Sequence, residues 1–144
     1  MSDAAQTLDA AAAKYTDYPQ KWQKRFAFYD TYGDPDSATF KAAFKSKDLP
    51  NKQKRLINFN WLAFFFSIIY LFILGLWKHA LVWIGIWVVF MYATMFMGRF
   101  SEMVANGGGA AIAVMIAMSV NFNYYKAKIR QQQDWNPVAG VRWF

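Results

Sequence analysis

The sequence contains no cysteine, a single histidine and a single glutamate among its 144 residues. Without cysteine the chain has no disulfides, no thiolate catalysis and no cysteine-bound metal or cluster site. One histidine and few carboxylates cannot supply the several protein ligands that a metal site needs. No nucleophile and base are arranged for covalent catalysis. We therefore expect a protein without a cofactor that is not an enzyme.

Charge is also missing from three long stretches, at residues 56–77, 80–97 and 110–125. As a helix, the first stretch would run roughly 33 Å, which is enough for a typical hydrocarbon core. A chain of 144 residues is too short to wrap three such helices in a polar shell, which argues against a soluble protein with buried helices. The sequence predicts an all-α integral membrane protein with two or three membrane helices at about 56–77, 80–97 and 108–126.

Residues 1–50 hold much of the charge and precede the first apolar stretch as a small amphipathic helical segment. The alanine-rich start, residues 1–14, predicts a frayed helix. A helix is expected over 18–33, because Pro19 suits a first turn and Gly33 suits a helix end. A second short helix follows Asp34. Two interpretations of this segment stay open: helices that lie on the membrane surface, or a small two-helix cap with a solvated basic face.

The net charge is +7, and the basic residues flank the apolar stretches instead of forming a separate patch. This distribution is typical of cytoplasmic segments of membrane proteins and argues against nucleic-acid binding. We expect the cytoplasmic N-terminal side to contact anionic lipid headgroups or a partner. The residues predicted for that contact are Lys21, Trp22, Lys24, Arg25, Lys52, Lys54 and Arg55.

The distribution of basic residues favours two crossings over three. If all three stretches span, one of the basic clusters at 52–55 and 126–130 lies outside, against the usual bias. If only the second and third span, both clusters and Lys78 are cytoplasmic, and the loop in which Arg99 pairs with Glu102 is external. The first stretch would then be re-entrant or lie in the interface, although its length still favours spanning.

A transporter or channel subunit is the alternative function, because intramembrane polar groups often line a path. The polar residues that would do so are Asn58, Asn60, His79, Arg99, Glu102, Asn121 and Asn123. Most of them lie near predicted helix ends, which favours a membrane-anchored interaction or regulatory protein.

Small residues recur every four positions at Gly109, Ala113 and Ala117. Such a face lets helices approach closely. Here it predicts that the third helix packs closely against another helix, which belongs to the same chain, to a second copy in a homo-oligomer, or to another membrane protein. The triple glycine at 107–109 predicts a flexible turn before the third helix. Residues 131–144 are expected to form a short irregular tail.

Several motifs resemble those of a family of small bacterial inner-membrane proteins of unknown function. They are N-F-N-W-x-A-F-F-F at 58–66, G-L-W-K at 75–78 and, over 21–33, KWQKRFAFYDTYG. The resemblance covers about residues 20–130, and it implies the inner membrane as location and assigns no catalytic residues. The family usually carries Gly-Pro after the three phenylalanines, where this chain has Ser67-Ile68. Because proline kinks helices, its absence argues against a broken first stretch.

Overall fold

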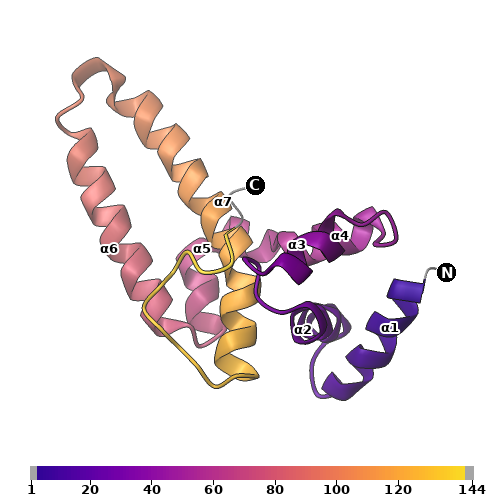
Figure 1. The fold of residues 1–144 in the computed structure, drawn as a ribbon. Coiled ribbons are helices and arrows are strands. Elements are labelled where there is room, and N and C mark those ends of the chain that lie inside the picture. Colours follow the sequence, from indigo (N-terminus) through magenta and orange to yellow (C-terminus); the bar gives the residue numbers. More distant parts are fainter. Residues whose placement is uncertain (1–2, 142–144) are drawn as a thin grey trace.

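The structure is a computed structural model that describes residues 3–141, and it confirms the all-α fold class. Figure 1 shows two long helices that project as a hairpin from a group of shorter ones. In chain order the helices are α1 (Asp3–Ala12), the short 3-10 helix η1 (Ala13–Tyr15), α2 (Gln20–Tyr32), α3 (Ala38–Lys45), α4 (Asn51–Asn58), α5 (Trp61–Ile73), α6 (Trp77–Thr94), the 3-10 helix η2 (Gly98–Phe100) and α7 (Ser101–Lys128).

The N-terminal helices form a domain with an aromatic core. Phe26 and Phe28 of α2 are completely buried, and Phe40 of α3 packs edge-on against Phe28. Helix α1 was expected to be frayed, yet Leu8 is buried in the same core, so α1 docks through an apolar face. Tyr125 of α7 belongs to this core as well. The N-terminal helices therefore pack on each other and on α7.

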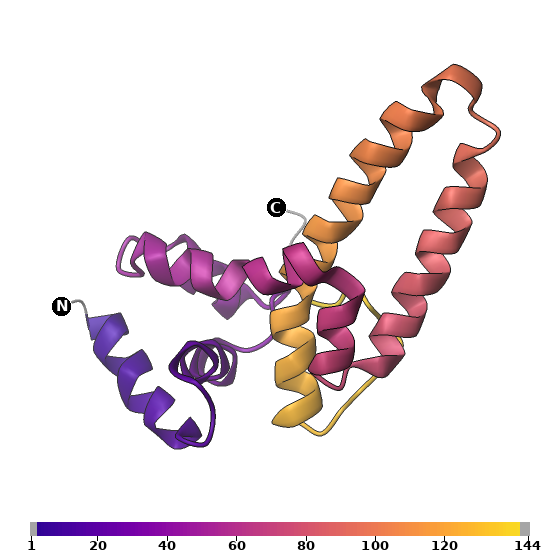
Figure 2. The same cartoon turned by 180° about the vertical axis from the view of Figure 1, so that it is seen from behind.

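The first apolar stretch is divided into two helices. Helix α4 ends at Asn58, and Asn60 adopts an extended conformation in which its side chain caps α5 by accepting hydrogen bonds from Leu62 N and Ala63 N. A second break lies at Ser67, with φ of 41° and ψ of −118°, inside α5. The chain turns sharply there (Figure 2). The absence of Gly-Pro argued against a break in this stretch, whereas the chain is broken at Ser67 without the proline that usually explains a kink.

Helices α6 and α7 run antiparallel as a long hairpin whose tip contains η2 (Figure 1). The three glycines at 107–109, expected in a turn, lie inside α7. By length and apolar composition, two helical segments of the described chain could cross a membrane: Asn51–Ile73 and Gly98–Lys128. The first of these contains both breaks. The residues from 131 to 141 are irregular, as expected, and run back across the base of the hairpin.

Candidate functional site

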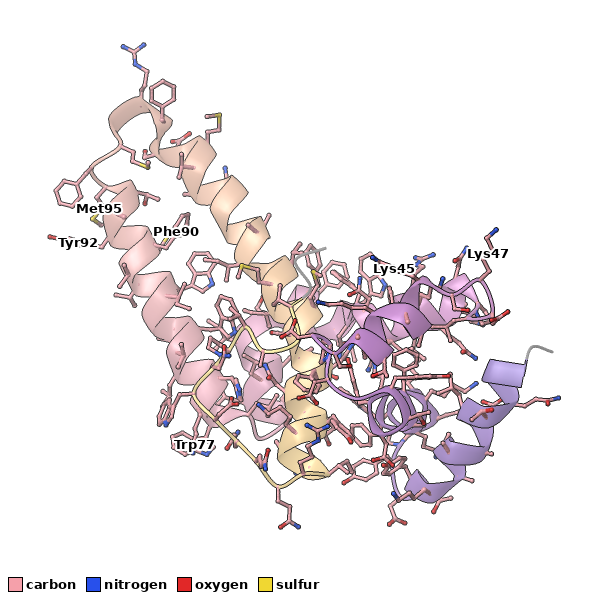
Figure 3. The ribbon with its side chains drawn as sticks, in the orientation of Figure 1. Lys45, Lys47, Trp77, Phe90, Tyr92 and Met95 are labelled. Atoms are coloured by element: carbon pink, nitrogen blue, oxygen red, sulfur yellow. The ribbon has the colours of Figure 1, made fainter. Side chains whose placement is uncertain are left out.

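The outer half of the hairpin presents apolar side chains to the surroundings. Val88 and Val89 of α6 are 63% and 69% exposed, and Met95 and Phe96 at the tip are both 76% exposed. Figure 3 shows Tyr92 and Met95 projecting from this end of α6, whereas Trp77 lies at the opposite end, the base. An apolar surface of this extent marks a site of contact with lipid or with another protein.

Glycines of α7 let the two hairpin helices approach each other. A Cβ atom added at Gly108 would overlap the ring of Phe90, and one added at Gly109 would lie 3.2 Å from Cη2 of Trp87. The predicted small-residue face included Gly109 but missed Gly108, which makes the closer approach. Of its other members, Ala117 is completely buried and Ala113 is half-buried.

A pair of buried asparagines joins α7 to the break between α4 and α5. Asn60 Nδ2 donates to Asn121 Oδ1 at 3.1 Å, and Asn121 Nδ2 donates to the carbonyl of Ile57 at 2.9 Å. The backbone N–H of Asn60 donates to the carbonyl of Ala117 at 3.0 Å. Because the chain is not helical at Asn60, these bonds satisfy backbone groups that the interrupted helix leaves unpaired.

Two of the residues predicted for lipid contact lie inside the N-terminal domain. Arg25 is 6% exposed, stacks 4.5 Å above Trp22, and donates from Nε to the carbonyl of Leu56 at 2.9 Å. Trp22 is itself buried. Lys24, half-buried, forms an ion pair with Asp9 at 3.3 Å. Arg25 thus fixes α2 against the α4–α5 junction, and Lys24 ties α2 to α1. Trp22 packs against Tyr124 of α7, with ring centroids 4.5 Å apart.

The base of the hairpin is covered by the C-terminal segment through polar contacts. Lys78 Nζ donates to the carbonyl of Gln133 at 2.9 Å, and Asp134 forms an ion pair with Lys126. His79, 2% exposed, places Nε2 3.4 Å from Asp134 Oδ1, although neither ring nitrogen makes a hydrogen bond within the described chain. Partial burial raises the pKa of Asp134, but the hydrogen bond and charge of Lys126 outweigh it, so the pKa lies below its ordinary value.

The polar residues predicted to line a path fall in separate places. Asn60 and Asn121 form the hydrogen-bonded pair between α7 and the α4–α5 break, which we call the joint. Asn58 ends α4 beside it. Asn123 donates to the carbonyl of Pro137 in the C-terminal segment, which also covers His79. Arg99 of η2 and Glu102 in the first turn of α7 are exposed, and the structure records no ion pair between them. Within residues 3–141, no group of three potential metal ligands occurs.

Exposed cations gather along α3 and α4. Figure 3 shows Lys45 and Lys47 on the edge of the N-terminal domain that faces the same way as the hairpin tip. Helix α4 follows, with Lys52 and Arg55 exposed and Lys54 half-buried. We name this surface the basic edge; its residues are Lys45, Lys47, Lys52, Lys54 and Arg55. The residues predicted for lipid contact included Lys52, Lys54 and Arg55. They did not include Lys45 and Lys47, because charge alone does not reveal which way a surface faces. Lys21, also predicted, is exposed at the start of α2.

A family described as "Protein of unknown function (DUF2628)" matches residues 6–130. The protein named "Uncharacterized protein YigF" from Salmonella typhimurium is 35% identical over 121 residues, which cover 81% of this chain and 90% of that protein. The protein of the same name from Escherichia coli is 34% identical over the same shares. No solved structure matches the chain. The resemblance to a bacterial family of unknown function, noted in the sequence, is thereby confirmed.

Proposed function

The chain belongs to the DUF2628 family of proteins of unknown function, and we propose that it is a membrane-anchored interaction or regulatory protein without catalytic activity. One observation carries this proposal: the large hydrophobic residues that are exposed lie at Trp61 and beyond, whereas residues 6–58 have none in the described structure. A chain divided in this way suits a helical domain in water joined to an element in lipid.

The membrane element of this proposal is the α6–α7 hairpin, in which α7 belongs to one of the two segments that could cross a membrane and α6 to neither. Helix α6 has 18 residues and α7 has 28, lengths of about 27 Å and 42 Å at 1.5 Å per residue. Lys78, Lys126 and Lys128 lie at the base of the hairpin, which we assign to the cytoplasmic side of the inner membrane. The tip, with Arg99 and Glu102, is then external, and the N-terminal domain and the C-terminal segment are both cytoplasmic.

The interaction element is the N-terminal domain, held at the membrane by the hairpin. Its aromatic core and its contacts to α7 give it one fixed orientation relative to the anchor. It would present its charged surface to a membrane-protein partner, a second copy or the bilayer itself. The alternative of a transporter or channel receives less support, because a path needs polar groups that converge between helices, and here they are divided between the joint, the base and the tip.

Aspartates introduced on the lipid-facing surface test the anchor. In Val88→Asp/Val89→Asp, each aspartate costs about 2.5–3.5 kcal/mol of insertion free energy at a helix centre. We expect the native protein to resist alkaline extraction from membranes, and the variant to be extracted or degraded. The matched control is Thr31→Asp/Ala42→Asp, at exposed positions of α2 and α3, which should stay in the membrane. Native protein that alkaline treatment releases would contradict the proposal.

A further inference from the structure

We propose that the basic edge and the first half of α5 form a docking surface for anionic phospholipid headgroups, which holds the α4–α5 segment in the membrane interface. This inference rests on the proposed anchor and names the partner of the N-terminal domain as the charged lipid itself. Three features of the described structure carry it: an amphipathic sequence of side chains, their direction relative to the hairpin, and the balance of charge.

The first feature is that cations are followed directly by exposed apolar rings. Helix α4 and the first half of α5 lie nearly in line (Figure 2), although their hydrogen bonding is interrupted at Asn60. Lys52 and Arg55 are exposed on α4. On α5 the exposed side chains are Trp61 (56%), Leu62 (54%), Phe65 (71%) and Phe66 (54%). Basic residues beside aromatic and aliphatic ones are typical of helices that lie in the interface plane.

The second feature is the direction of this surface. The break at Ser67 turns the second half of α5 away, and the buried residues Tyr70 and Leu71 pack it into the base of the hairpin. The first half remains on the outside of the molecule. Lys45 and Lys47 lie on the domain edge that faces the tip side (Figure 3). When the tip crosses the bilayer, Lys45 and Lys47 therefore face the lipid headgroups.

The third feature is the charge of the edge. Five cations occur between residues 45 and 55, with Asp48 as the one carboxylate among them. Lys54 Nζ donates to the carbonyl of Ser46 at 2.7 Å, which fixes the loop between α3 and α4 within the edge. A cationic surface at the cytoplasmic leaflet attracts anionic lipids, and the neighbouring apolar rings suit a bilayer rather than a nucleic acid or an acidic protein.

The test measures which lipid lies next to α4 in the full-length protein. The chain has no cysteine, so Asn51→Cys carries a single fluorophore at the exposed start of α4, and Val89→Cys carries one in the hairpin. Each protein is reconstituted in bilayers that contain spin-labelled phosphatidylglycerol or spin-labelled phosphatidylcholine. The ratio of quenching at position 51 gives the preference for the anionic lipid, and quenching at position 89 reports the anchor.

The comparison uses two double variants that each remove two exposed lysines. In Lys47→Gln/Lys52→Gln the preference for phosphatidylglycerol should fall by about 5-fold for each lysine at low salt. In Lys21→Gln/Lys128→Gln, which changes α2 and the end of α7 away from the tip, the preference should stay unchanged. High salt should remove the preference of the native protein, because it screens exposed charges.

No preference in the native protein, or an equal loss in both double variants, would overturn the inference. Quenching at position 89 without quenching at position 51 would also overturn it, while leaving the anchor intact. If position 89 is not quenched by either lipid, the proposed function fails together with the inference.

Discussion

At the scale of single residues, the Asn121 amide is the group on which the junction between α7 and the α4–α5 break depends. Asn121→Ala leaves the Nδ2 group of Asn60 and the carbonyl of Ile57 buried without this partner. We expect the free energy of unfolding to fall by about 1–3 kcal/mol. Reversible denaturation in detergent micelles measures it. Asn106→Ala, at an exposed position of the same helix, is the control, and an equal effect of both substitutions would refute the role of the joint.

The shifted pKa of the Asp134 carboxyl makes the stability of the protein depend on pH. Its pKa lies below the ordinary value in the folded protein, because the contact with Lys126 outweighs partial burial. Its contribution to stability is therefore present above the unfolded pKa of about 4 and is lost as the pH falls through the lower folded value. We expect Asp134→Asn to lower the thermal unfolding temperature at neutral pH, and the gap to the native protein to close in acid. The exposed Asp36→Asn serves as control; a gap that stays constant with pH would show that the ion pair is not the cause.

Which single residues matter could be inferred only in part from the sequence. Asn60 and Asn121 are conspicuous as amides in apolar surroundings, because a buried amide needs a partner. Their pairing depends on contacts between positions 61 residues apart, which no local pattern contains. Arg25 has the sequence context of a surface cation. Its burial follows from the carbonyl of Leu56, which lacks a helical partner near the end of α4 and accepts from Nε.

At the scale of the elements, the hairpin depends on glycine where α7 meets the ring of Phe90. Gly108→Ala should lower the free energy of unfolding by a net amount of up to about 2 kcal/mol, because displacing that ring costs about 1–3 kcal/mol and the helix propensity of alanine returns up to about 1 kcal/mol. Gly107→Ala has nothing within 4 Å of the added atom and should raise it by up to about 1 kcal/mol, since alanine favours helix. Denaturation of the two variants in the same detergent compares them. Equal behaviour would mean that the helices do not touch at Gly108.

Local sequence signals predict the ends of some helices but not the breaks within others. Pro19 and Gly33 bound α2 as the sequence predicted, and Gly33 has a φ of 82°. The charge distribution favoured a first stretch that does not cross, but it did not place the breaks at Asn60 and Ser67, since the uncharged apolar run has no proline or glycine at either position. At Asn60 the break is fixed by a hydrogen bond to Ala117 on another helix. The glycines at 107–109 predicted a turn by composition, whereas their helical role depends on two large side chains of α6.

At the scale of the whole molecule, the division between a charged domain and an apolar hairpin is visible in the sequence. Three uncharged stretches flanked by basic residues indicate lipid contact whatever the details of packing. The sequence does not reveal that the N-terminal domain packs on α7 through Tyr125, or that Lys45 and Lys47 of the basic edge face the tip side. Both follow from tertiary contacts between distant segments, and both determine what the domain presents to the membrane.

Membrane sidedness tests the central claim most directly. Single cysteines replace the exposed residues Lys52, Glu102 and Gln132 in the otherwise cysteine-free chain, and an impermeant thiol reagent is added to intact or opened cells. The account predicts that only position 102 is labelled in intact cells, because the hairpin alone crosses and the N-terminal domain and C-terminal segment share the cytoplasm. Labelling of position 132 but not of positions 52 and 102 would show three crossings, and it would contradict the account.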